Sequence, residues 1–113
     1  MLFISLEDFY DQARKMQRMT IEQEKECALA MAQGDAQARQ RLICSYLPFV
    51  AARIRRAPQE IQTLHTVYSA IATLEKGVDT FHFQQDSETF SHHLSWRLRQ
   101  CLTRCIADRP SIN

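Results

Sequence analysis

Apolar side chains recur at helical spacing in five stretches of the chain, and short polar stretches separate them. Positions i, i+3, i+4 and i+7 share one face of an α-helix, so the pattern predicts five amphipathic helices. The predicted helices span about residues 5–17, 20–33, 35–54, 61–78 and 91–108. Only two Gly and three Pro occur in 113 residues, which disfavours a turn-rich β fold. We therefore expect one all-α domain, a compact bundle of four to five helices.

Residues that cap or interrupt helices refine these boundaries. Short polar side chains can accept hydrogen bonds from the N–H groups of a first helical turn. On this basis we expect N-caps at Ser5, Thr20, Asp35 and Ser91. Gly34 is suited to end the second helix. Pro48 lies inside the third stretch, so that helix must kink or divide in two.

The last stretch carries an apolar stripe along one side. Leu94 and Leu98 begin it, and Cys101, Leu102 and Cys105 continue it at helical spacing. Because other stretches carry similar stripes, we expect one shared core. Its predicted members are Leu42, Ile43, Val50, Leu74, Val78, Leu94, Leu98, Leu102 and Ile106.

The other sides of the last stretch have a composition typical of nucleic-acid binding. Arginines such as Arg97 and Arg104 can neutralise phosphates, and Gln100 and Thr103 can reach base edges. Trp96 can stack on an unpaired base. The alternative interpretation is an ordinary amphipathic helix with a solvated basic side. Overall charge does not decide between them, because 14 Lys and Arg face 13 Asp and Glu.

Other chemistry is poorly supported by the sequence. No phosphate-binding glycine loop or nucleophile–histidine motif is present, so we expect neither enzyme activity nor a cofactor. We interpret the four cysteines as small core residues in a reducing, cytoplasmic protein. A zinc site of Cys101 and Cys105 with His92 or His93 is the alternative, with poor spacing. No stretch approaches the ~20 apolar residues of a membrane span.

The order of residues in the last stretch resembles one known family. Phe90-Ser91, then Trp96, then Leu98-Arg99-Gln100-Cys101-Leu102-Thr103-Arg104 resembles the promoter-reading helix of bacterial sigma-70 factors. The stretches 20–35, 38–43 and 46–54 are similar to the helices that precede it in sigma region 2. The resemblance therefore implies an all-α fold like sigma region 2, spanning about residues 20–108.

The same resemblance implies which residues bind DNA. In the family, aromatics of this helix capture flipped bases of the melted −10 element, and a Gln and a Thr one turn apart read its upstream edge. The residues at matching places are Phe90, His93, Trp96, Arg97, Arg99, Gln100, Thr103 and Arg104. Two of them depart from the family pattern, since His93 replaces a usual Tyr and Arg97 replaces a usual second Trp.

Binding to RNA polymerase is the second implication of the resemblance. The family grips the polymerase clamp with a run that is typically Asp-Leu-Ile-Gln-Glu-Gly. Here the run is His65-Thr66-Val67-Tyr68-Ser69-Ala70, with His65, Tyr68 and Ser69 at the polar positions. We therefore expect weak or altered binding to core polymerase. The alternative function is a degenerate sigma-like module that binds polymerase, an anti-sigma factor or a partner subunit without reading DNA.

The predicted organisation is an N-terminal helix in residues 1–19, a sigma region 2-like domain in residues 20–109 and a tail in residues 110–113. A full sigma factor continues into a helix-turn-helix domain that reads the −35 element, whereas this sequence ends at Asn113. We therefore expect a natural minimal relative or a truncated one. A second chain that supplies the −35-reading domain, or an anti-sigma factor, is a further implied partner.

Overall fold

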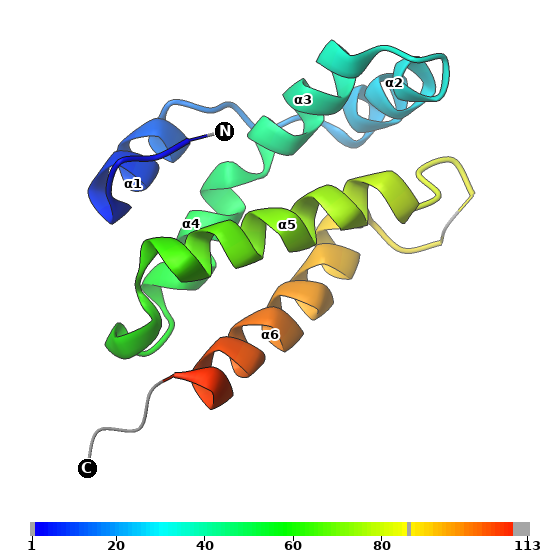
Figure 1. Cartoon of the computed structure of the whole chain (residues 1–113). Coiled ribbons are helices and arrows are strands. Elements are labelled where there is room, and N and C mark those ends of the chain that lie inside the picture. The colour runs from blue at the N-terminus through cyan, green and yellow to red at the C-terminus, as the bar shows by residue number, and fades with distance from the viewer. Residues whose placement is uncertain (1, 86, 110–113) are drawn as a thin grey trace.

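The computed structural model describes residues 2–85 and 87–109, and these form six α-helices joined by short connections (Figure 1). The helices are α1 (Leu6–Arg14), α2 (Ile21–Ala32), α3 (Ala36–Ser45), α4 (Leu47–Arg55), α5 (Leu64–Thr80) and α6 (Phe90–Asp108), and a short 3-10 helix, η1 (Gln59–Ile61), precedes α5. The described residues contain no strand, so the predicted all-α class is confirmed. The predicted tail, residues 110–113, lies outside the described residues.

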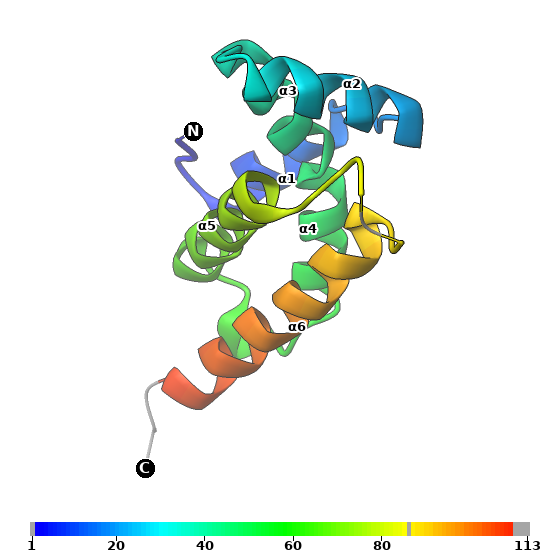
Figure 2. The same ribbon diagram turned by 90° about the vertical axis from the view of Figure 1, so that its right-hand side faces the viewer.

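The helices pack around an antiparallel pair formed by α5 and α6 (Figures 1 and 2). Helix α4 contacts both members of this pair, and α1 packs against α4 and α5. Helices α2 and α3 pack against each other, and α3 also contacts α5. Phe9 of α1 is fully buried in the same core cluster as α4 and α5, so the N-terminal helix shares the core of the rest.

The predicted core is confirmed except at its C-terminal end. The members on α3, α4 and α5, together with Leu94 and Leu98, are all buried in one cluster. Leu102 is only half-buried and packs against the edge of that cluster, and Ile106 is half-buried outside it. At this end α6 lies beside the short helix η1, and Arg109, just beyond α6, pairs with Glu60 of η1.

Side-chain caps fix most helix starts as predicted. Ser5 Oγ accepts the Asp8 N–H at 3.0 Å, Thr20 forms a full capping box with Gln23, and Asp35 caps α3. Gly34 has the left-handed φ of 94° that ends the preceding helix.

The prediction of Ser91 as the N-cap of α6 is wrong. Thr89 has the extended backbone of an N-cap, and its Oγ1 accepts the His92 N–H at 3.2 Å. The helix therefore begins at Phe90. This earlier start aligns Phe90 with Leu94 and Leu98 on the buried face, so core packing favours it.

Pro48 divides the third predicted helix in two. Helix α3 ends at Ser45, Tyr46 stands between the helices, and Pro48 is in the first turn of α4, where its missing N–H is not needed. The Ser45 hydroxyl donates to the Leu42 carbonyl at 2.7 Å, which satisfies one of the acceptors left open at the end of α3.

Helix α5 continues past the predicted end at residue 78 to Thr80, so Gly77 lies inside the helix. An added Cβ at Gly77 would lie 3.5 Å from the Phe90 ring, which is ordinary van der Waals contact. We therefore expect Gly77→Ala to stabilise the fold by about 0.5–1 kcal/mol, since alanine loses less backbone entropy in a helix. Urea denaturation measures this, and a lower midpoint for Gly77→Ala would contradict the packing of α5 on α6.

A buried acid joins α2 to the bend between α3 and α4. The Tyr46 hydroxyl donates to Glu24 Oε2 at 2.7 Å, and both residues are buried. Burial raises the pKa of the Glu24 carboxyl, and the Tyr46 hydrogen bond and the charge of Arg18 only partly oppose this. Burial, followed by the neighbouring Glu24, also raises the pKa of Tyr46.

The raised pKa of Glu24 makes the stability of the fold depend on pH in a predictable direction. Protonated Glu24 stabilises the fold fully below the carboxyl's unfolded pKa of about 4.3, and the benefit is lost as pH rises through the raised folded value. Glutamine keeps an acceptor for Tyr46 without a charge. We therefore expect the stability of Glu24→Gln, measured relative to the unmodified protein by urea denaturation, to increase from pH 4 to pH 7. A difference that is constant with pH would contradict a raised pKa.

Candidate nucleic-acid interface

One face of α6 is polar, exposed and centred on a tryptophan. Trp96 is 59% exposed, although it is among the largest apolar side chains of the protein. Arg99, Gln100 and Thr103 are also exposed. At 3.6 residues per turn, these four residues fall within an arc of about 100° on the side opposite Leu94 and Leu98. The structure therefore brings together one aromatic face, one cation and two hydrogen-bonding side chains.

The hydrogen bonds already present limit what this face can offer. The Thr103 hydroxyl donates to the Arg99 carbonyl at 2.8 Å, so its lone pairs remain to accept. The Gln100 side chain has no hydrogen-bond partner within residues 2–85 and 87–109, so both its carbonyl oxygen and its NH₂ group are available. Amide groups of this kind can pair with base edges.

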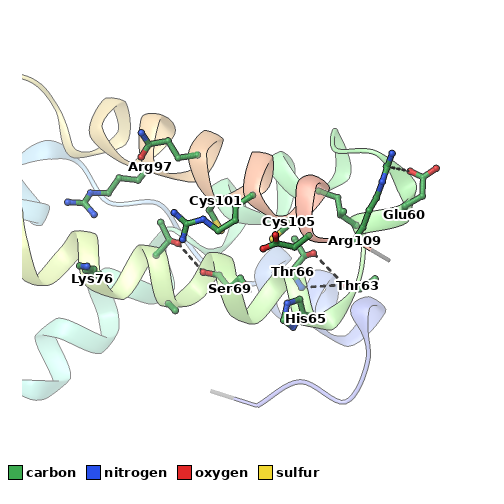
Figure 3. A pocket seen from close by; sticks show the side chains of 16 residues that line it. Glu60, Thr63, His65, Thr66, Ser69, Lys76, Arg97, Cys101, Cys105 and Arg109 are labelled. Carbon is green, nitrogen blue, oxygen red and sulfur yellow. Dashed lines mark hydrogen bonds and ion pairs between the residues drawn. The ribbon is translucent and has the colours of Figure 1, made fainter. Parts of the chain in front are cut away.

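Arg97 and Arg104 lie at the edge of this face, where α6 meets α5. A groove of about 770 Å³ runs between the two helices and η1, and both arginines line it together with Lys76 of α5 (Figure 3). Gln100 lines the groove as well, so the groove is continuous with the Trp96 face. In the part of the chain that the structure describes, these three cations form no ion pair with a carboxylate.

The groove becomes less basic toward η1. Arg109 pairs with Glu60 at 3.6 Å, and Asp108 also lines that end. Cys101 and Cys105 line the groove with half-buried thiols, and burial raises the pKa of the Cys101 thiol. The prediction that all four cysteines lie in the core is therefore wrong, since only Cys27 is buried. No group of three metal-binding side chains occurs among the described residues.

Phe90 is not on the exposed face of α6. Its ring is only 2% exposed and packs against Tyr46, Phe81 and Phe83 at centroid distances of 5.0–5.3 Å. In this structure it therefore presents no face on which a base could stack, and we remove it from the candidate interface.

His93 is also separated from the Trp96 face. Its side chain is 23% exposed, and its ring packs against Phe81 with centroids 5.0 Å apart. Its Nε2 accepts the Arg97 Nε–H at 2.8 Å, and its Nδ1 lies 3.4 Å from a Glu88 carboxylate oxygen. His93 is thus enclosed by its own protein on three sides.

The three residues that were predicted to contact polymerase point to different places. His65 and Ser69 line the α5–α6 groove (Figure 3). Tyr68 instead holds the N-terminal segment: its hydroxyl accepts the Phe3 N–H at 2.9 Å and donates to the Phe3 carbonyl at 3.2 Å. We call residues 2–4 the N-terminal strap. Both hydrogen bonds of the Tyr68 hydroxyl are made to this strap.

Sequence reasoning missed both Lys76 and the N-terminal strap. Lys76 follows Ser69 and Thr73 at helical spacing, which was a usable signal for a shared face. Nothing in the sequence linked Phe3 to Tyr68, because the two residues are 65 positions apart.

The chain matches no model of a known protein family. None of the described helices is long and apolar enough to cross a bilayer. The fold and the α6 surface therefore define an all-α helical domain with one polar, tryptophan-centred face.

Proposed function

We propose that this protein is a sigma region 2-like domain that binds melted promoter DNA of the −10 type in the bacterial cytoplasm. The observation that carries the proposal is the exposed Trp96, with Gln100 and Thr103 on the same face of α6. An unpaired base is a natural partner for the exposed face of an aromatic side chain.

The roles within the interface follow from these positions. Trp96 stacks on an unpaired base. Gln100 and Thr103 contact base edges at the upstream end of the bound element. Arg97, Arg99 and Arg104 supply the phosphate contacts, which give affinity without sequence preference.

The proposal predicts a preference for single strands over intact duplex. Extruding a base from a closed duplex costs a few kcal/mol, and an isolated domain has no polymerase to provide that energy. The test is fluorescence anisotropy with a non-template-strand −10 oligonucleotide, a scrambled oligonucleotide of the same composition and the duplex form, at two salt concentrations. Equal affinity for the two single strands would remove the promoter-reading function.

A second candidate function is a protein-interaction module without DNA reading. The observation that favours it is the apolar surface near Tyr68, where Leu2 and Ile4 are 87% and 90% exposed. Under this proposal, core polymerase, an anti-sigma factor or a partner subunit binds the exposed Leu2 and Ile4 side chains of the N-terminal segment, where that segment covers Tyr68. Pull-down of core polymerase that is lost in Leu2→Ser and Ile4→Ser variants, together with no oligonucleotide preference, supports this alternative.

A further inference from the structure

We infer that His93 is a positioning residue, which holds the guanidinium of Arg97 ready to bind a phosphate of the DNA strand. The ligand in this inference rests on the proposed function, because the phosphate belongs to the strand whose base stacks on Trp96. The residues that carry it are Glu88, His93 and Arg97, which we call the Glu–His–Arg relay.

The protonation of His93 in the relay follows from its contacts. Arg97 Nε always carries a hydrogen, so His93 Nε2, 2.8 Å away, has to be the acceptor. A neutral imidazole that accepts at Nε2 carries its proton on Nδ1. That nitrogen faces Glu88 Oε1 at 3.4 Å, so the carboxylate favours the same tautomer.

The surroundings of the relay hold its ring and stem in place. The His93 ring packs against Phe81 and lies near Phe90, with centroids 5.0 and 6.3 Å away. The stem of Arg97 passes over Gly77, close enough that a Cβ there would lie 3.8 Å from Arg97 Cδ. Both halves of the hydrogen bond therefore rest on the packed α5–α6 interface.

The relay leaves the outer edge of Arg97 available. An arginine has five N–H donors, and the bond to His93 uses only the one on Nε. The remaining four donors lie on the two terminal nitrogens, an arrangement that matches two oxygens of a phosphate. Arg97 forms no ion pair among the described residues, so no carboxylate competes for this edge. The Nε contact to a neutral imidazole leaves the full positive charge in place.

The location of Arg97 indicates that its ligand is a phosphate of the DNA strand bound at Trp96. Arg97 follows Trp96 in α6 and lines the groove that is continuous with the Trp96 face through Gln100. A strand whose base stacks on Trp96 therefore brings its backbone near Arg97. Because the guanidinium is held before binding, less side-chain entropy is lost when the phosphate arrives.

Affinity measurements on a double-mutant cycle test the inference. His93→Phe keeps a ring against Phe81 but removes the acceptor, and we expect it to weaken binding of the −10 oligonucleotide about three- to tenfold. In an Arg97→Ala background the same change is expected to have no effect, since there is nothing left to position. His93→Gln, which retains an acceptor, is expected to recover part of the affinity. His92→Phe is the matched control, because the His92 side chain is 73% exposed and touches the relay only at Glu88, where its Nε2 lies 3.7 Å from Oε2.

A spectrum of the free protein tests the relay without DNA. Long-range proton–nitrogen NMR correlations are expected to show His93 protonated at Nδ1 and unprotonated at Nε2, and this preference is expected to weaken in Arg97→Ala, where only Glu88 still favours it. Thermal unfolding confirms that each variant folds.

Each contrary result overturns a different statement. If His93→Phe lowers DNA affinity equally with and without Arg97, His93 contacts DNA directly. If Arg97→Ala weakens binding but His93→Phe does not, Arg97 needs no positioning. Either outcome leaves the proposed function standing and overturns the inference, as does a protonated Nε2. Equal binding of the −10 and scrambled oligonucleotides, unchanged by Trp96→Ala, would overturn the proposed function itself and the phosphate as the ligand of Arg97.

Discussion

Replacing Trp96 with alanine is expected to weaken binding of a single-stranded −10 oligonucleotide by roughly 5- to 150-fold. The range corresponds to the 1–3 kcal/mol that stacking on one aromatic side chain contributes per base. Trp96 is 59% exposed in the free protein, so its removal leaves no cavity, and the stability of the fold is expected to change little. Anisotropy titration measures the first effect and urea denaturation the second.

Two further variants make this experiment specific. Trp96→Phe keeps a smaller aromatic face and is expected to retain part of the affinity. Leu29→Ala removes a comparably exposed apolar side chain on α2, at 54% exposure, and is expected to leave DNA binding unchanged. A similar loss of affinity from Leu29→Ala and Trp96→Ala would point to nonspecific apolar contact instead of base stacking.

Phe90→Ala is expected to have the largest effect on stability, a loss of about 3–5 kcal/mol. The Phe90 ring is 2% exposed and fills the space between Tyr46, Phe81 and Phe83, so its removal creates a large cavity. A loss of this size is a large part of the 5–15 kcal/mol that holds a typical domain folded. Urea denaturation followed by circular dichroism measures it.

The same position separates a core role from a DNA-binding role. Phe90→Leu keeps most of the buried volume, so we expect a smaller loss of stability and a folded protein at room temperature. Because leucine cannot stack as an aromatic, this variant would lose DNA affinity only if the Phe90 ring contacted a base. We expect its oligonucleotide affinity to equal that of the unmodified protein, and a tenfold loss in the folded variant would return Phe90 to the interface.

Local sequence features predicted the fold well because helices and their caps are determined within a few residues. Thr20 with Gln23 and Asp35 with Ala38 form the hydrogen bonds expected from their spacing. The error at the start of α6 shows the limit of such reasoning. Thr89 and Ser91 are both good caps, and only the packing of Phe90 in the core decides between them.

The candidate site was only partly predictable, because side chains of α6 interact with residues from elsewhere. The exposed set around Trp96 follows from helical periodicity alone. The separation of His93 from that set depends on Glu88, in the preceding loop, and on Phe81 at the end of α5. Similarly, the hydrogen bonds between the Tyr68 hydroxyl and the Phe3 main chain could not be predicted, because the two residues are 65 positions apart.

The two departures from the sigma-70 pattern on α6 are joined in the structure. Where the family usually has a Tyr and a second Trp, this chain has His93 and Arg97, four residues apart and hydrogen-bonded to each other. A change at either position alone would break that bond. Under the proposed sigma region 2-like function, the pair would be one coupled substitution, in which a hydrogen-bonded cation stands where the family usually has two aromatic side chains.

The N-terminal strap competes with any partner that forms a hydrogen bond to the Tyr68 hydroxyl. Such a partner has to compete with the Phe3 main chain for one hydroxyl, so its apparent affinity is its intrinsic affinity multiplied by the fraction of molecules in which the strap has already left. Phe3 is 5% exposed and packs on Phe9, so strap release also removes an anchor of α1. A partner that displaces Phe3 from Tyr68 is therefore expected to loosen α1 as well. Partner binding can then be followed by measuring the order of α1, and the order of α1 by measuring partner binding.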